Sequence, residues 1–115
     1  MSSSAPSGDD LVRVLATLAS PHRLRVLAAL VRERNYVSRL ARELGISRAL
    51  LQVHLRKLEA AGLVSARMEI SDDGKAMKFY EVNPFAFLLT PEVVETAART
   101  LTVPGDDGDG TKGSM

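Results

Sequence analysis

Two short helical patterns separated by three residues constrain the fold of this chain more than any other feature. The first follows Ser38 and ends at Leu44, and the second follows Ser47 and runs to about Ala61, with apolar residues at helical spacing in both. Gly45 between them supplies a left-handed helix stop, and Ser38 and Ser47 are expected N-caps. A turn of this length between two short helices predicts a helix-turn-helix.

After Gly62, the spacing at which apolar residues recur changes from 3.6 residues to 2, which predicts strands. The first strand has alternating inward side chains, namely Val64, Ala66, Met68 and Ile70. The Asp-Gly pair within residues 72–75 favours a hairpin turn, and Met77 to Val82 form the return strand. The predicted fold class is therefore mainly α (α+β), a winged helix-turn-helix with a two-stranded β-hairpin wing.

Two further helices are expected before this motif. Asp9 and Asp10 are N-cap candidates for the first. Ser20-Pro21 is a capping residue followed by the favoured first-turn proline, so a second helix begins there, and Asn35 ends it. Its expected inward stripe consists of Leu24, Leu27, Ala28 and Val31.

A final helical region is expected after the wing. Asn83-Pro84 opens it, and Thr90-Pro91 restarts it as a helix through Leu101. Residues 1–8 and 103–115 are rich in small and polar residues and predict disordered tails. One domain is therefore expected over residues 9–102.

Composition excludes several classes of protein. The chain has 115 residues and no cysteine, which excludes disulfides, thiolate metal sites and cysteine nucleophiles. No apolar run approaches the roughly 20 residues that cross a bilayer, and the first eight residues do not form a signal peptide, so a cytoplasmic location is expected. Because no nucleophile-base pair, paired carboxylates or glycine-rich phosphate loop occurs, we do not expect an enzyme.

Positive charge is concentrated in the middle of the chain. Residues 20–71 contain ten basic residues against four acidic ones, whereas the whole chain has a net charge of +1. This asymmetry indicates a surface that binds a polyanion. A solvated helical surface is the alternative that charge alone leaves open.

The helix that begins after Ser47 is expected to turn Leu51, Leu55 and Leu58 toward the core. Its other side is slim and mostly small or basic, which suits a major groove about 12 Å wide. Gln52 matches the adenine edge, and Arg48 or Arg56 the guanine edge. The predicted DNA-binding residues are Arg39, Ser47, Arg48, Leu50, Gln52, Val53, Arg56 and Lys57, together with Arg67, Lys75 and Lys78 on the wing.

Several of these residues are expected to contact phosphates rather than bases. Arg39 and Arg42 can reach the DNA backbone from the preceding helix. Ser47 is expected to act as a helix cap, with phosphate contact as the alternative. Asp72 and Asp73 at the hairpin tip oppose deep insertion, so the wing is expected to touch the backbone.

Four segments, taken in order, carry a family resemblance: Ala19–Arg25, Leu40–Ser47, Val53–Val64 and Phe79–Pro84. Together they resemble the arsenical-resistance-repressor (ArsR) family of winged-helix regulators. The resemblance implies a homodimeric, nucleoid-associated repressor whose two recognition helices read the half-sites of an inverted repeat in double-stranded DNA. It also implies base contacts at Arg48, Leu50, Gln52 and Val53. Family members commonly have serine at the position of Gln52, so the resemblance does not indicate which base sequence this chain reads.

The sensing chemistry of that family has no counterpart in this sequence. Its thiolate motif requires cysteine, and no histidine follows Val82. His54 is expected to pack at a helix boundary rather than bind metal, and His22 has no assigned role. We expect no metal site and no cofactor, and a small-molecule effector stays open.

The first helix and the final region hold more apolar surface than a small core needs, so the surplus is expected to meet a second copy. The expected dimer interface consists of Leu11, Val14, Leu15, Leu18, Phe87, Leu88, Val93 and Val94. The alternative is a monomer whose last helix folds back on its own first helix. The alternative function is a winged-helix protein-interaction module that binds an acidic partner.

Overall fold

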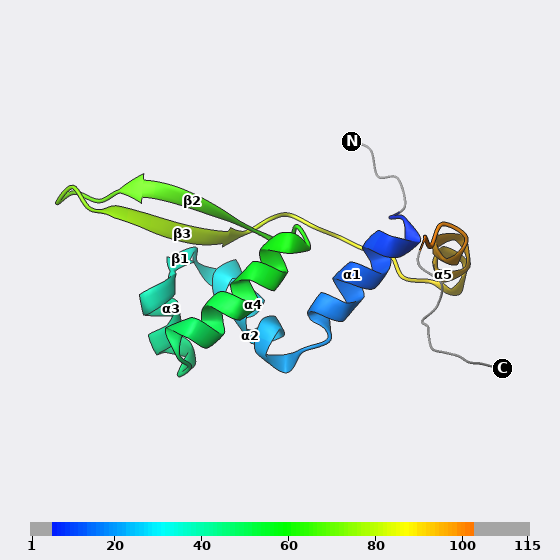
Figure 1. Cartoon of the computed structure of the whole chain (residues 1–115), viewed down its shortest axis with the longest axis horizontal. Helices are drawn as coiled ribbons and strands as arrows, with labels where there is room; N and C mark the ends of the chain where they lie inside the picture. The colour runs from blue at the N-terminus through cyan, green and yellow to red at the C-terminus, as the bar shows by residue number, and fades with distance from the viewer. Residues whose placement is uncertain (1–5, 103–115) are drawn as a thin grey trace. The chain divides into compact units, whose positions relative to one another are not determined.

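The structure is a computed structural model that describes residues 6–102. Within that range it has five α-helices and one three-stranded antiparallel sheet (Figure 1). The elements in chain order are α1 (Gly8–Leu18), α2 (Pro21–Arg32), β1 (Asn35–Tyr36), α3 (Val37–Leu44), α4 (Arg48–Ala60), β2 (Val64–Ile70), β3 (Ala76–Val82) and α5 (Pro91–Ala98). The predicted winged helix-turn-helix is confirmed. Most of the two expected tails, residues 1–5 and 103–115, lies outside the described residues.

The chain divides into two compact units. The larger unit covers residues 16–86 and contains α2, the helix-turn-helix and the sheet. The smaller unit, as far as the structure describes it, covers residues 6–15 and 87–102 and holds most of α1 together with α5.

The core of the larger unit is built around α4. Leu51, Leu55 and Leu58 are each 0% exposed, as their spacing predicts. They share one apolar cluster with buried residues from α2, α3, the sheet and the turn after α4, among them Val26, Leu30, Leu40, Leu63 and Tyr80. This packing fixes the rotation of α4 about its own axis, which decides which side chains it presents outward.

The turn between α3 and α4 has the predicted geometry. Gly45 adopts φ 70°, ψ 30°, and its N–H donates to carbonyls at the end of α3. The Ser47 hydroxyl accepts a hydrogen bond from the Leu50 N–H at 3.0 Å, so Ser47 is the N-cap of α4. The expected cap at Ser38 is wrong. The helix begins at Val37, because the preceding Tyr36 is extended in β1 and forms no side-chain cap.

The wing is the predicted hairpin, with a third strand that the sequence did not indicate (Figure 1). β2 and β3 pair antiparallel from Val64 opposite Val82 to Ile70 opposite Ala76. The two-residue β1 pairs with the middle of β3. Asn35 was expected to end the second helix, but α2 ends at Arg32, and Asn35 is buried in β1.

The expected inward alternation along β2 holds only near its base. Val64 is buried and Ala66 half-buried, whereas Met68 and Ile70 are exposed. The outer half of the hairpin extends beyond the hydrophobic cluster, so no core lies opposite those two side chains.

The expected inward stripe of α2 is wrong except for Leu27. Leu24 and Val31 are exposed, and the side chains of Val26, Ala29 and Leu30 are buried instead. Apolar residues occupy most sides of this helix. Its buried side is therefore set by its packing on α4 and β3, which the local period does not reveal.

The helical region expected from Asn83 does not form, because residues 83–90 are irregular. Asn83 ties the end of β3 to the end of α4 instead: its side-chain N–H donates to the Gly62 carbonyl at 2.9 Å. Its side-chain oxygen accepts from the Ser65 hydroxyl at 2.7 Å. With the amide engaged in this way, Asn83 caps no helix.

The final helix is a single element that begins where Thr90-Pro91 predicts. The Thr90 hydroxyl accepts from the Val93 N–H at 3.1 Å, and Pro91 occupies the first turn. The helix ends at Ala98 rather than continuing to Leu101.

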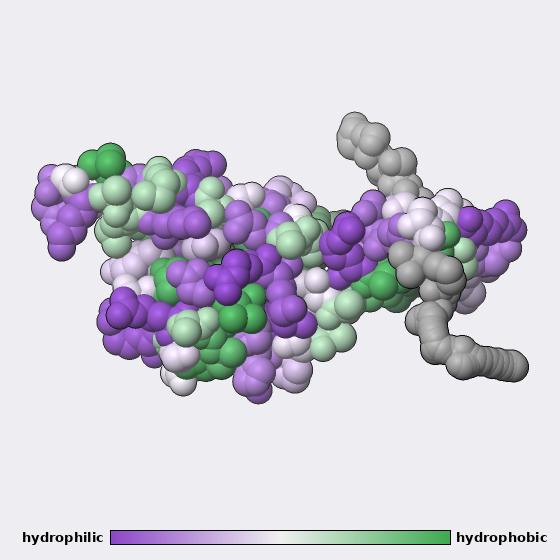
Figure 2. All heavy atoms as spheres, viewed as in Figure 1, coloured by the Kyte–Doolittle hydropathy of each residue, from purple (hydrophilic) through white to green (hydrophobic). Residues whose placement is uncertain are grey.

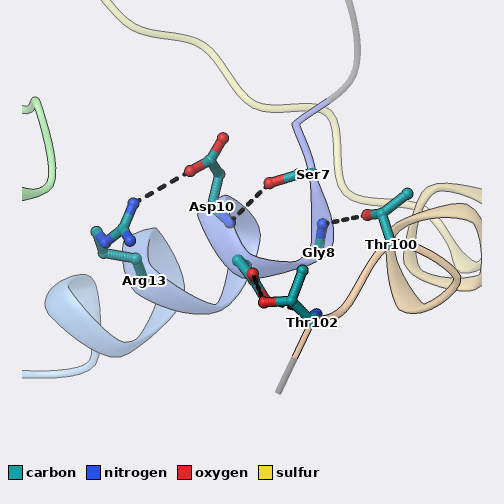
Figure 3. Close-up of polar contacts among 7 residues, drawn as sticks. Ser7, Gly8, Asp10, Arg13, Thr100 and Thr102 are labelled. Carbon is teal, nitrogen blue, oxygen red and sulfur yellow. Dashed lines mark hydrogen bonds and ion pairs between the residues drawn. The ribbon is translucent and has the colours of Figure 1, made fainter. Parts of the chain in front are cut away.

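Within the smaller unit, the segment after α5 contacts the start of α1 (Figure 3). The Gly8 N–H donates to the Thr100 hydroxyl at 2.6 Å. The Asp9 carboxylate accepts from the backbone N–H and the hydroxyl of Thr102, which lowers the pKa of Asp9. The cap of α1 is Ser7, whose hydroxyl accepts from the Asp10 N–H at 3.1 Å, so Asp9 and Asp10 are first-turn residues and not caps.

Candidate DNA-binding surface

The face of α4 opposite its buried leucines is open to solvent. Arg48, Arg56 and Lys57 are exposed, and Gln52 is half-buried. Two apolar side chains share this face, Leu50 at 42% exposed and Val53 at 38%. The predicted base-contacting residues therefore lie outside the core, as entry of α4 into a major groove requires, and their contact with DNA stays a prediction.

The basic residues of the helix-turn-helix differ in how far their charge is already neutralised. Arg39 lies 3.7 Å from the Glu33 carboxylate and 3.4 Å from that of Glu43. Among residues 6–102, the cations Arg42, Arg48, Arg56 and Lys57 form no ion pair. Those four can bind phosphate or base without breaking an existing pair, whereas Arg39 competes with two carboxylates.

Ser47 lies at the N-terminus of α4, where the helix dipole favours an anion. Its hydroxyl oxygen accepts the capping bond from Leu50, which leaves the hydroxyl proton available to a phosphate oxygen. The capping role is confirmed. The phosphate contact stays a prediction.

The wing carries charges of both signs. Lys75 and Lys78 are exposed, and the Lys78 ammonium lies 5.5 Å from the centre of the Tyr80 ring. Arg67 is paired with Glu81 across the hairpin at 3.2 Å. The Ser71 hydroxyl and the Lys75 N–H donate to the Asp73 carboxylate, which lowers its pKa and keeps it ionised at the tip. Figure 2 shows hydrophilic side chains around this tip beside apolar ones.

His54 is buried at 8% exposed, and neither ring nitrogen has a hydrogen-bond partner among residues 6–102. Its ring stacks on that of His22, with centroids 5.7 Å apart. Burial lowers the pKa of His54, and charge interactions with Arg23, His22 and Lys57 lower it further. His54 is therefore neutral at pH 7 and packs between α4 and the start of α2, as expected for a helix-boundary residue.

The residues present do not fit a metal-thiolate sensor. The chain has no cysteine. Within residues 6–102, no three His, Asp or Glu side chains are grouped so as to hold a metal ion.

The structure divides the residues expected at a dimer interface into two groups. Leu11 and Val14 are buried within the chain, Leu18 packs against the cluster of the larger unit, and Val93 is half-buried. The others remain exposed: Leu15, Phe87, Leu88 and Val94. Leu88 has the largest exposed fraction of the four, 74%.

In the described part of the chain, no single helix is long and apolar enough to cross a membrane. Only α1 and α2, which are bent relative to each other, reach that length and apolar composition when they are counted together.

Comparison with known proteins identifies relatives over most of this chain. The family model described as "Bacterial regulatory protein, arsR family" matches residues 20–66. A similar protein is the HTH-type transcriptional regulator MJ0229 of Methanocaldococcus jannaschii. It is 31% identical over 86 residues, which are 75% of this chain and 90% of that protein.

Two solved structures share the fold. NolR from Sinorhizobium fredii is 27% identical, with a TM-score of 0.58, and the match covers 86% of this chain and 92% of that one. The homodimeric winged helix-turn-helix DNA-binding domain Mb0332 from Mycobacterium bovis is 25% identical, also with a TM-score of 0.58. That match covers 79% of this chain and 74% of the other.

Proposed function

This chain belongs to the ArsR family of bacterial regulatory proteins and is a DNA-binding transcriptional regulator, and from that premise we propose that it acts as a homodimeric repressor on an inverted repeat. Each protomer places α4 in the major groove of one half-site. A twofold dimer then spaces the two helices about 34 Å apart, one turn of DNA.

One observation carries the proposal: α4 buries its leucine stripe completely and leaves the opposite face open with cations that form no ion pair among the described residues. A helix whose polar face packed into its own protein could not enter a groove. Here Arg48 and Arg56 are available for guanine O6 and N7, and Gln52 for adenine N6 and N7.

Phosphate contacts set the register of the complex in this proposal. Arg42 and Lys57 contribute full charges, Arg39 a partly neutralised one, and Ser47 a hydroxyl at the start of α4. On the wing, Arg67, Lys75 and Lys78 approach the flanking backbone, while Asp72 and Asp73 keep the tip out of the groove floor.

The homodimer is supported by the apolar residues that stay exposed in α1, in α5 and between β3 and α5. Leu15, Phe87, Leu88 and Val94 form the interface in this proposal. The M. bovis relative is described as homodimeric, which favours the same assembly here. The intrachain contact between Thr100 and Gly8 uses a different set of atoms.

The proposed regulator has no metal-thiolate sensor, because the sequence offers no thiolate. We place it in the cytoplasm with the nucleoid, where its DNA ligand is found.

Selection of bound fragments from a random duplex library tests the proposal. An enriched inverted repeat with half-site centres one turn apart is expected. If a dimer neutralises about eight phosphates, the logarithm of affinity falls with the logarithm of salt at a slope near −7. A flat salt response, beside tight binding to an acidic protein, would instead identify a protein-interaction module.

A further inference from the structure

Arg34 links the start of the helix-turn-helix to the wing across 35 positions of sequence. Its guanidinium donates two hydrogen bonds to the Glu69 carboxylate in β2, one of them from Nη2 to Oε1 at 3.0 Å. The guanidinium carbon also lies 4.6 Å from the centre of the Phe79 ring in β3. One arginine thus holds both strands of the wing, through a two-pronged ion pair on one strand and a cation–π contact on the other.

Tyr36 completes this cluster. Its ring meets the Phe79 ring edge-on, with centroids 5.5 Å apart and planes at 79°. The two residues are also direct partners in the β1–β3 register. Phe79 therefore contacts both Arg34 and Tyr36, which come from the segment leading into α3. We call Arg34, Tyr36, Glu69 and Phe79 the wing clamp.

The outer wing has little else to hold it in place. β1 contributes two residues and pairs only with Phe79 and Tyr80, so beyond that level the wing is a two-stranded ribbon. Such ribbons are marginally stable in water and twist more strongly than wider sheets. Glu69 lies in this outer part, opposite Met77. Within residues 6–102, the remaining hydrogen bonds and ion pairs of the outer ribbon stay inside the hairpin.

We infer that Arg34 is a positioning residue: through Glu69 and Phe79 it fixes the direction of the wing relative to α3 and α4, and so sets where Lys75 and Lys78 meet the DNA backbone. The effect on DNA rests on the proposed function, whereas the order of the wing does not. Arg34 itself is not a DNA contact in this inference, because Glu69 already binds its guanidinium.

A matched pair of variants separates positioning from charge. Glu69→Gln and Glu81→Gln each remove one carboxylate from the wing, so each lowers the repulsion of DNA by one negative charge. Each also frees the arginine that the carboxylate had paired with, Arg34 or Arg67. Only Glu69→Gln breaks the clamp, since Glu81 pairs with Arg67 inside the hairpin. Arg34→Lys is a second test that keeps the positive charge and loses the two-pronged bond, and Arg25→Lys is its control.

Two measurements on the whole chain decide the inference. Amide hydrogen exchange of residues 67–80 is expected to be faster in Glu69→Gln and Arg34→Lys than in the parent and the two controls. Affinity for a mixed-sequence DNA duplex is measured by fluorescence anisotropy and is expected to be about three- to tenfold weaker for Glu69→Gln than for Glu81→Gln. The difference is limited because an exposed ion pair contributes little free energy, and it is counted twice because a dimer has two wings. The reversed pair, Arg34→Glu with Glu69→Arg, is expected to restore the slow exchange.

Each of the other possible outcomes would overturn one part of this inference. Equal exchange in Glu69→Gln and Glu81→Gln would show that the clamp does not order the wing. Faster exchange with equal affinities would show that wing direction does not serve DNA binding. If the parent itself fails to bind the duplex, the proposed function fails, and the exchange rates still decide whether Arg34 orders the wing.

Discussion

Replacing Leu55 by alanine tests how α4 is anchored. The side chain is 0% exposed and belongs to the central apolar cluster. The change removes three carbon groups worth about 0.8 kcal/mol each, and the cavity left behind adds to that loss. We expect the free energy of unfolding to fall by about 2 to 5 kcal/mol, which in a domain of this size lowers Tm by about 10 to 30 °C.

Thermal and urea unfolding followed by circular dichroism measure this loss. Leu50→Ala is the matched control, because it is the same substitution on the same helix at a side chain that is 42% exposed. Its expected cost is below about 1 kcal/mol. Equal costs for the two variants would show that the leucine stripe does not hold α4 against the core, and the assignment of its outward face would fail with it.

Three further predictions concern pH, capping and assembly. Since the pKa of His54 is lowered from 6.5, the unfolded chain binds the proton first, so the free energy of unfolding should fall as pH decreases below 6.5. Urea titrations at several pH values measure this fall, and His54→Leu should reduce it; an unchanged pH profile in that variant contradicts the burial of a neutral ring. Ser47→Ala should cost about 1 kcal/mol of stability while Ser47→Thr costs less, and equal urea midpoints for all three proteins would exclude the cap. Leu88→Arg should convert a dimer to a monomer in sedimentation experiments, and an unchanged mass would remove Leu88 from the interface.

Local signals in the sequence predicted the central motif well. The leucine spacing of α4, the left-handed Gly45, the Ser47 cap and the Asp-Gly hairpin each depend on residues within a few positions of one another. The same local reasoning located the start of α5 at Pro91. Each of these features depends on the backbone conformation and hydrogen bonds of residues that are neighbours in the sequence.

Features that depend on distant partners were missed. The third strand exists because Asn35 and Tyr36 find β3 more than forty positions away. Asn83 was expected to cap a helix, but its amide binds Gly62 and Ser65. No short sequence pattern indicates which distant residues will pair in this way.

The candidate site shows the same division. The outward face of α4 followed from helical period alone. The engagement of Arg39 by Glu33 and Glu43 did not, because a formal charge carries no information about its partners. Arg34 and Glu69 are separated by 35 positions, so only the folded chain reveals the wing clamp.

The salt dependence of DNA binding by Arg56→Ala tests the outward face of α4 most directly. Arg56 is exposed on that face, whereas Arg25 is exposed on α2, which packs against the buried side of α4. A recognition helix in the groove predicts that Arg56→Ala binds a selected duplex at least about tenfold more weakly than Arg25→Ala, at unchanged Tm. If Arg56 contacts phosphate, the salt slope also becomes less steep by about 2 per dimer. Equal affinities and slopes for the two variants would contradict the placement of α4 against DNA.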